Sequence, residues 1–200
     1  MIDVVSYFAE KYKEWDTFID ASKNGTLMLK RGYVEYHSDR FTDFSLMFYD
    51  EGKLVAAMPA SLHGDEVRSH GGLTYGGIIS DRKMTTKKMR SVFDALTSYL
   101  KENVKKLIYK CIPSVYHTYP ADEDLYVLFR KEAKPVRRDM FAFDFLGNEL
   151  ISNFFEDKIW FDFGISTGNG GMMLNEGLCQ QMETFGGRSI VYDFYELEIK

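Results

Sequence analysis

The stretch His70-Gly-Gly-Leu-Thr-Tyr-Gly-Gly-Ile-Ile-Ser80 places four glycines in a run that otherwise has the composition of a β-strand. A glycine inside a strand weakens it and often marks the close approach of another backbone or of a ligand. The next segment, about 85–100, has an amphipathic helical pattern, and Lys106–Ile112 has the pattern of a strand that Pro113 ends. The middle of the chain therefore predicts a βαβ-like unit of strand, glycine-rich turn, helix and strand.

The segments on either side of this unit also have readable patterns. Before it, we expect a helix over 7–22, a short strand at Leu27–Leu29, and a three-stranded meander with strands at Phe44–Tyr49, Lys53–Ser61 and Val67–Ser69. After it, we expect a helix over 120–133, a strand over 136–145, a short helix over 150–155, a strand over 159–163, a glycine-rich loop over 164–171, a helix over 174–185 and a strand over 188–199.

The composition limits the kind of protein. The chain has 200 residues, of which 45% are hydrophobic and 28% charged, values close to the averages for soluble globular domains. The net charge of −5 disfavours non-specific binding to nucleic acid. We expect no membrane span, because no run approaches about 18 apolar residues. Cys111 and Cys179 have no metal-ligand spacing, so we expect a reducing, cytoplasmic location.

Basic residues crowd the start of the helix predicted from about Thr85. First turns usually carry acids, because a helix N-terminus has a partial positive charge. A bound phosphate, held by backbone N–H groups and flanking cations, would account for the bases, whereas a solvated basic face after a tight turn is the alternative. The residues predicted for this anion site are Tyr75, Gly76, Gly77, Arg82, Lys83, Thr85, Thr86, Lys87 and Lys88.

Two of the four histidines are candidate general bases, since an imidazole titrates near neutral pH. His37 lies among charged residues and His70 precedes the glycine run, although a structural or solvent-facing role is the alternative for each. The histidines share no helical spacing, so we expect no metal site. Gly164–Gly168 matches the pattern G-x-S-x-G, but the loop continues to Gly171 before a helix can begin, which disfavours a nucleophile elbow.

Several segments together resemble a known family. They are Tyr36–Phe41, His70–Gly77, Tyr109–Lys110, Tyr126–Phe129, Phe161–Thr167, Leu174–Leu178 and Phe185–Arg188. With these segments and its order of elements, the chain resembles the GNAT acyltransferases, and more specifically their FemAB-like branch, whose members carry two GNAT-like modules in tandem.

The resemblance implies an α+β fold with a GNAT-like mixed, mainly antiparallel sheet flanked by helices. It implies acetyl-CoA or another acyl-CoA as co-substrate and a small-molecule or sugar-linked amine of a cell-envelope precursor as acceptor. The pyrophosphate would lie at the helix N-terminus, and His37 or His70 would be the base. Residues 1–145 resemble a whole GNAT-like module, and 146–200 resemble the remnant of a second module that completes the same sheet in one compact domain.

The chain departs from the family pattern in its second half. Relatives of this kind are longer, and the missing material would fall between about Arg138 and Ile159. Gly168 and Met182 stand where an acid and a lysine are expected. A catalytically inactive binding or assembly module is therefore the alternative function. The aromatic-rich stretch Phe141–Phe163 is the expected interface of a homodimer, with an ordinary core role as the alternative.

Overall fold

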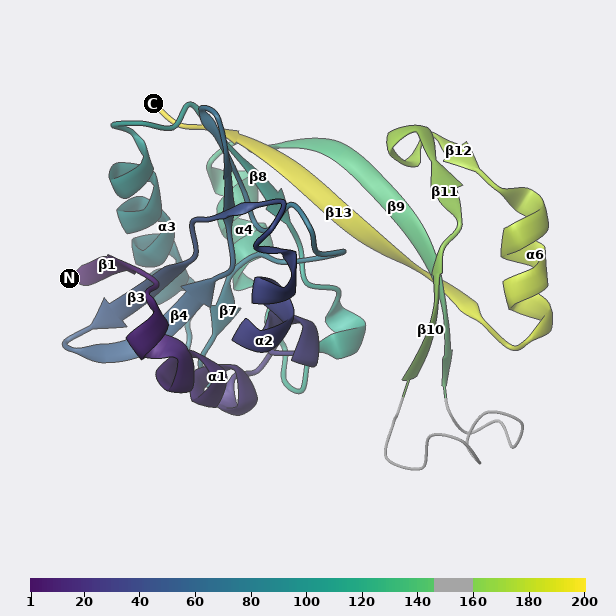
Figure 1. Ribbon diagram of the computed structural model, residues 1–200. Coiled ribbons are helices and arrows are strands. Elements are labelled where there is room, and N and C mark those ends of the chain that lie inside the picture. Colours follow the sequence, from purple (N-terminus) through teal and green to yellow (C-terminus); the bar gives the residue numbers. More distant parts are fainter. Residues whose placement is uncertain (146–159) are drawn as a thin grey trace. The chain divides into compact units, whose positions relative to one another are not determined.

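The computed structural model describes residues 1–145 and 160–200 (Figure 1). The chain divides into two compact units, the first made of Met1–Pro135 with Phe194–Lys200 and the second of Val136–Asp193. The short helix expected over 150–155 lies outside the described residues. The division into modules at 145/146 stays a prediction.

The first unit contains a four-stranded antiparallel sheet in the order β1-β3-β4-β7. Its strands are β1 (Ile2–Ser6), β3 (Leu46–Asp50), β4 (Lys53–Met58) and β7 (Ile79–Ser80). The β3–β4 hairpin confirms the turn predicted at 50–52, where Glu51 and Gly52 have positive φ values of 52° and 76°. The predicted glycine-rich strand is wrong over most of its length, because only its last two residues form β7.

The first unit also contains strands in the order β13-β8-β6-β5-β2. They are β8 (Lys106–Lys110), β6 (Glu66–Arg68), β5 (Ser61–His63), β2 (Thr42–Asp43) and the last residues of β13 (Arg188–Glu198). β6 and β8 are parallel and the other described pairs are antiparallel. Phe194 lies opposite Lys110 and Glu198 opposite Lys106, so the C-terminal strand lies in the same sheet as the strand predicted at Lys106–Ile112, as expected.

The predicted three-stranded meander is wrong. The segment Lys53–Ser61, expected as one strand, divides into β4 and β5, which belong to different sheets. Pro59 lies at the break, and it has no N–H with which to continue a ladder. Ala60 then bonds back to the start of β3, where its N–H donates to Ser45 Oγ at 3.2 Å. The proline in the sequence was the signal for this change of sheet.

Helices cover both faces of the four-stranded sheet. The helical segments of the first unit are η1 (Ala9–Lys11), α1 (Tyr12–Ala21), η2 (Leu27–Leu29), α2 (Arg31–Val34), η3 (Glu35–His37), α3 (Thr86–Leu100), η4 (Ser114–Tyr116) and α4 (Glu123–Arg130). Phe48 and Ala56 belong to a core cluster with residues of α3 and α4. Tyr49 points to the opposite face, where its hydroxyl donates to Glu14 Oε1 of α1 at 3.1 Å. No helix in the described ranges is long and apolar enough to cross a membrane.

Two N-terminal expectations need correction. The helix predicted over 7–22 begins at Tyr12 after the 3₁₀ turn η1, and the strand β1 precedes it. Leu27–Leu29 is the 3₁₀ helix η2 rather than a strand. Its carbonyl at Leu29 accepts the Trp15 indole N–H at 2.9 Å, and the Lys30 N–H turns back to Leu27 O at 3.2 Å. These tertiary bonds favour a tight turn over an extended chain.

The second unit is built on the long strands β9 (Lys134–Phe145) and β13. Its other elements are β10 (Trp160–Ile165), β11 (Thr167–Gly168), η5 (Asn169–Gly171), β12 (Met173–Leu174) and α6 (Glu176–Thr184). The helix predicted over 174–185 starts two residues later, because the Asn175 side chain caps it by accepting the Leu178 N–H at 3.1 Å. Ser166 of the G-x-S-x-G pattern is buried between two strands, and its hydroxyl donates to Met140 O at 3.1 Å.

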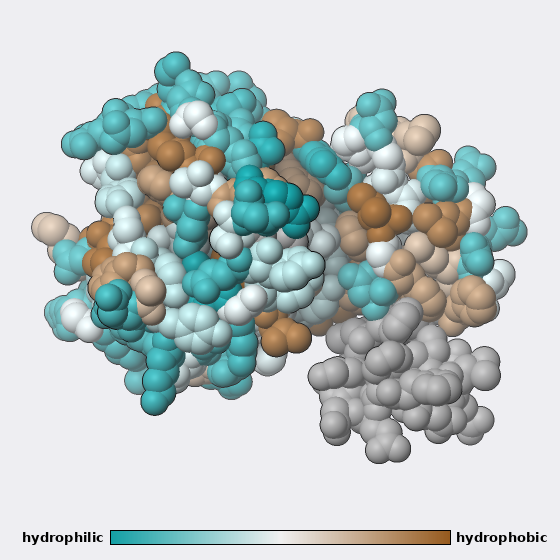
Figure 2. Space-filling model, in the orientation of Figure 1, coloured by the Kyte–Doolittle hydropathy of each residue, from teal (hydrophilic) through white to brown (hydrophobic). Residues whose placement is uncertain are grey.

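The aromatic side chains of the second unit differ in exposure. Phe141 and Phe143 are buried, with ring centroids 4.0 and 6.4 Å from that of Tyr192. Phe154 and Phe155 lie outside the described residues. The surface of this unit carries exposed apolar residues (Figure 2), namely Ile165, Met172, Met173, Leu174, Phe185 and Val191. Phe141 and Phe143 are therefore core residues of the second unit.

Candidate functional site

The N-terminus of α3 forms where the sequence predicted it. Thr85 is the N-cap, and its Oγ1 accepts the Lys88 N–H at 3.3 Å. Asp81 fixes the turn before it, because its Oδ1 accepts the Lys83 N–H at 3.1 Å. The first turn of α3 contains no acidic residue. The positive end of the helix dipole is thus not offset by the helix's own side chains.

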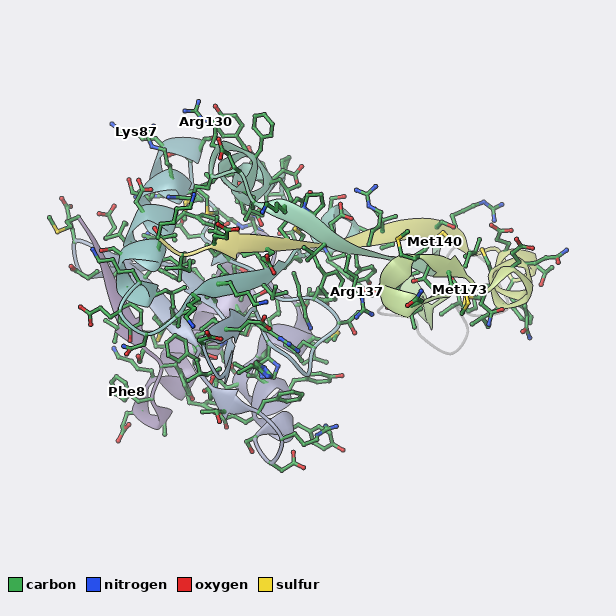
Figure 3. All side chains as sticks on the ribbon, turned by 90° about the horizontal axis from the view of Figure 1, so that it is seen from above. Phe8, Lys87, Arg130, Arg137, Met140 and Met173 are labelled. Atoms are coloured by element: carbon green, nitrogen blue, oxygen red, sulfur yellow. The ribbon has the colours of Figure 1, made fainter. Side chains whose placement is uncertain are left out.

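Some of the cations at this end are paired and others are not. Lys88 Nζ lies 2.8 Å from Asp50 Oδ2, and this hydrogen bond raises the pKa of the lysine and lowers that of the carboxyl. Arg82, Lys83 and Lys87 are exposed and make no ion pair within the described part of the chain. The Lys87 side chain extends outward from α3 (Figure 3). Three positive charges therefore have no counter-ion among the residues that the structure describes.

A cavity of about 300 Å³ lies beside these cations. Its lining residues are Met1, Ile2, Asp50, Thr85, Lys87, Lys88 and Ser91. Three of the nine residues predicted for the anion site (Thr85, Lys87 and Lys88) line it. Arg82, Lys83 and Thr86 are exposed in the same turn. Lys87 and Lys88 are thus the predicted cations that line the cavity, and the anion site itself stays a prediction.

Tyr75, Gly76 and Gly77 do not line that cavity. They precede β7, and they pack against the backbone of Ser69 and Lys110 and the side chain of Thr26. A Cβ on Gly76 would overlap the carbonyl oxygen of Ser69, and a Cβ on Gly77, where φ is +79°, would lie 2.8 Å from Lys110 O. Tyr75 is buried, and its hydroxyl donates to Thr26 Oγ1 at 2.9 Å. The two glycines therefore allow another backbone to approach closely, which is one of the reasons that a glycine occurs in a strand-like segment.

The loop that contains His70 is held by β8. Lys110 Nζ donates to the carbonyls of His70 and Leu73 at 2.8 and 2.6 Å, and the Lys110 N–H donates to Ser69 Oγ at 2.7 Å. His70 has a left-handed φ of +64° and is 2% exposed. Its Nδ1 accepts the Gly72 N–H at 3.2 Å, so a neutral His70 carries its proton on Nε2.

A second histidine lies beside His70 and was not selected from the sequence. Phe41 contacts both imidazoles, with centroid distances of 5.7 Å to His63 and 5.9 Å to His70. His63 Nε2 and Ser61 Oγ are 2.9 Å apart, and Ser61 Oγ accepts the Gly71 N–H at 2.8 Å. Burial, together with the charge of Arg68, lowers the pKa of His63. No local spacing signals this cluster, because its members come from three separate segments.

The histidine cluster is separate from the cavity at the start of α3, which neither His63 nor His70 lines. A helix of 15 residues is about 22 Å long. Its last turn borders a cavity with Leu62 and Gly64, the neighbours of His63, whereas its first turn carries the cations. The basic turn and His70 therefore do not share a cavity in the described structure. The side chain of His37, which ends η3, lies outside the described part of the structure.

A buried polar cluster, which the sequence did not reveal, supports β7 and α4. The Tyr109 hydroxyl donates to Asp124 Oδ2 at 2.6 Å and accepts the Ile78 N–H at 2.8 Å. Burial raises the pKa of Asp124 to about 6 and that of Tyr109 well above its ordinary value. The Asn24 amide completes the edge of β7 by donating to Ile78 O at 3.0 Å and accepting the Ser80 N–H at 2.9 Å.

Metal chemistry has no support in the described residues. Within 1–145 and 160–200, no group of three or more histidine, cysteine, aspartate or glutamate side chains could hold a metal ion.

Comparison with known proteins identifies the fold. No family model matches the sequence, and no curated protein is similar to it. Among solved structures, an acetyltransferase of the GNAT family from Streptococcus pneumoniae has a TM-score of 0.51 at 5% identity, with 100% of both chains covered. The ribosomal-protein-S18-alanine N-acetyltransferase from Escherichia coli has a TM-score of 0.50 at 10% identity, covering 100% of this chain and 95% of the other.

A third structure of this class is the acetyl transferase from Salmonella typhimurium that modifies the N-terminal serine of ribosomal protein L7/L12. It has a TM-score of 0.50 at 7% identity and covers 100% of this chain and 95% of its own. The chain thus has the α+β fold of the GNAT acetyltransferases, with a mostly antiparallel sheet and flanking helices. This confirms the fold predicted from the sequence. The FemAB-like branch and the shortened second module stay predictions.

Proposed function

We propose that the protein is an N-acyltransferase that uses acetyl-CoA or another acyl-CoA to acylate an amine. The observation that carries this proposal is a set of three cations at the capped N-terminus of α3, Arg82, Lys83 and Lys87, that have no counter-ion among the described residues. One of them, Lys87, lines a cavity of about 300 Å³. Backbone N–H groups, the helix dipole and flanking cations together make a site for phosphate. In a GNAT fold, the pyrophosphate of CoA is the ligand that suits it.

The separation of the histidine cluster from the cavity at the basic turn is compatible with acyl-CoA as the co-substrate. The thioester of acyl-CoA is separated from its pyrophosphate by the long pantetheine arm, so the reacting end must lie far from the phosphate site. His70 and His37 remain the proposed bases. A base must accept a proton from the amine. For His70 this requires loss of the Gly72 hydrogen bond at Nδ1 or a change of tautomer, since Nδ1 is the acceptor in this structure.

The FemAB-like resemblance supports a finer proposal for the acceptor and the setting. We propose a sugar-linked or other cell-envelope precursor as the amine acceptor, a cytoplasmic location, and a homodimer. The buried thiols of Cys111 and Cys179 are compatible with a reducing compartment. Light scattering tests the dimer, because a 200-residue monomer and its dimer differ twofold in mass.

Calorimetric titration with CoA tests the phosphate site. The double variant Arg82→Gln/Lys87→Gln is expected to bind CoA about tenfold more weakly than the wild type, because each substitution removes an attraction of about 0.3–1 kcal/mol near the helix end. Lys13→Gln/Lys101→Gln is the matched control, since it removes two exposed lysine charges elsewhere. Equal CoA affinity in the two double variants would refute the phosphate site.

The alternative function is a catalytically inactive GNAT-like binding or assembly module. The burial of His70 favours it, because a residue only 2% exposed cannot take a proton from an amine without movement of its loop. A transfer assay with acetyl-CoA and a panel of amines distinguishes the two functions. Release of free CoA that depends on the amine supports the enzyme, whereas CoA binding without release supports the binding module.

A further inference from the structure

A larger cavity, of about 610 Å³, lies at the opposite end of α3 from the basic turn. Its lining residues are Phe44, Leu62, Gly64, Ser98, Tyr99, Leu100, Glu102, Asn103 and Val104. None of the residues predicted for acyl transfer is among them. Its lining contains no lysine or arginine and several apolar side chains, whereas Lys87 and Lys88 line the cavity at the basic turn.

The wall formed by the end of α3 is electronegative. The last turn of the helix contains no basic residue, and a helix C-terminus carries a partial negative charge. The Leu100 carbonyl accepts N–H bonds from Asn103 and Val104 at 3.1 and 2.9 Å. By contrast, the Ser98 and Tyr99 carbonyls accept no bond from the residues described. These oxygens remain available to a donor in the cavity.

The side chain of Glu102 adds a full negative charge to this wall. It is exposed and has no ion pair within the described ranges, and the neighbouring Lys101 does not line the cavity. The Ser98 and Tyr99 carbonyls and the Glu102 carboxylate therefore favour a hydrogen-bond donor that carries a positive charge.

The remaining wall is apolar and aromatic. The rings of Phe44 and Tyr99 have centroids 6.3 Å apart and an interplanar angle of 57°. Tyr99 is held in place by a hydrogen bond of 2.7 Å between its hydroxyl and Ser6 Oγ. Leu62 and Val104 supply aliphatic surface next to these rings. Aromatic faces attract cations and also bury apolar groups, so this wall suits an organic cation better than a metal ion.

We propose that this cavity binds a small organic ammonium ion, a primary amine on a short apolar or aromatic body. Its ammonium donates to the Ser98 and Tyr99 carbonyls and faces Glu102, while its body packs against Phe44 and Leu62. The site lies about 22 Å from the phosphate turn along α3. It does not depend on the proposed acyl transfer, and it holds whether or not CoA binds.

The test is an NMR titration of the intact chain with phenethylammonium, with 2-phenylethanol as a probe of nearly equal size and no charge. Phenethylammonium is expected to bind about tenfold more tightly, from the combined attraction of the helix end, the rings and the carboxylate. The amide signals that shift should be those of Leu62 and of residues 98–104. Equal affinity of the two probes, or shifts confined to other residues, would overturn the proposal.

Two charge variants test the role of Glu102. Glu102→Gln is expected to reduce the preference for the ammonium probe about threefold, because it removes one exposed charge. Glu51→Gln removes an equal charge at an exposed position near Lys88, at the other end of α3, and should leave the preference unchanged. Tyr99→Leu should weaken the binding of both probes by removing the ring. The same preference in both glutamine variants would contradict the proposed site.

Discussion

The buried carboxyl of Asp124 should make the stability of this protein fall as the pH rises through the acidic range. Burial raises its pKa from the ordinary 3.8 to about 6, so the folded protein holds this proton more tightly than the unfolded chain does. Stability from this group is fully present below pH 3.8 and is lost as the pH rises to about 6. At about 1.4 kcal/mol for each pH unit, the loss is about 3 kcal/mol.

Urea unfolding of the wild type and of Asp124→Asn between about pH 4 and pH 8 measures this effect. The variant cannot ionise, so its free energy of unfolding should lack the fall of about 3 kcal/mol. It also loses one hydrogen bond, because an amide offers one acceptor oxygen where the carboxylate accepts from both Tyr109 and Leu125. Because the amide does not titrate, the test compares how the free energy of unfolding of each protein changes with pH, and a constant difference between the two proteins does not affect it.

The matched control is Asp3→Asn, which removes an exposed carboxyl without an ion pair in the described chain. Other carboxyls, such as Asp50 and Glu66, have lowered pKa values and contribute with the opposite sign, but they are present in all three proteins. The pH dependence of Asp3→Asn should therefore match that of the wild type. If the free energy of unfolding changed with pH in the same way in Asp124→Asn and in the wild type, the reasoning would be refuted.

Two further substitutions test the packing around β7. Gly76→Ala should destabilise the fold by about 3 kcal/mol or more, because its Cβ overlaps a carbonyl oxygen, whereas Gly64→Ala, with φ +65° and open space, should cost about 1 kcal/mol. Similar losses in both alanine variants, measured by urea unfolding, would contradict this contact. Asn24→Ala should cost about 2–4 kcal/mol, since it leaves the buried Ile78 carbonyl and Ser80 N–H without their partner; a loss under about 1 kcal/mol would show that other groups satisfy them.

The elements that the sequence predicted well are those whose signals are local. α3 has both a strong apolar stripe and a Thr85 cap, so its start is visible in the sequence. The strand predicted at Lys106–Ile112 forms as β8, but it ends at Lys110, two residues short of the prediction. The hairpin at Glu51–Gly52 was equally clear, because a tight turn between two apolar runs needs only adjacent residues.

The errors occurred where a distant contact decides the conformation. Leu27–Leu29 is apolar enough for a strand, but the bond from the Trp15 indole fixes it as a 3₁₀ turn. The glycine run predicts the close approach of another backbone or of a ligand, and at Gly76 the structure has the backbone, because a Cβ there would overlap the Ser69 carbonyl oxygen. Nothing in the spacing of the sequence reveals which backbone approaches a glycine.

The candidate site shows the same division. The basic turn could be predicted because Arg82, Lys83 and Lys87 are close in sequence and lie at a recognisable helix start. The pairing of Phe41 with both His63 and His70 joins segments that only the β2–β5–β6 pairing brings together. A scan for local motifs therefore finds the cations and misses the second imidazole.

The central claim is that the N-terminus of α3 binds the phosphates of CoA. The most direct measurement is calorimetric titration of the intact chain with CoA and with pantetheine, which has the same thiol arm and no phosphate. The account predicts that CoA binds at least tenfold more tightly than pantetheine, and that this advantage shrinks between about 50 and about 500 mM salt as the charges are screened. Equal affinity for the two compounds, or no detectable binding of CoA, would contradict it.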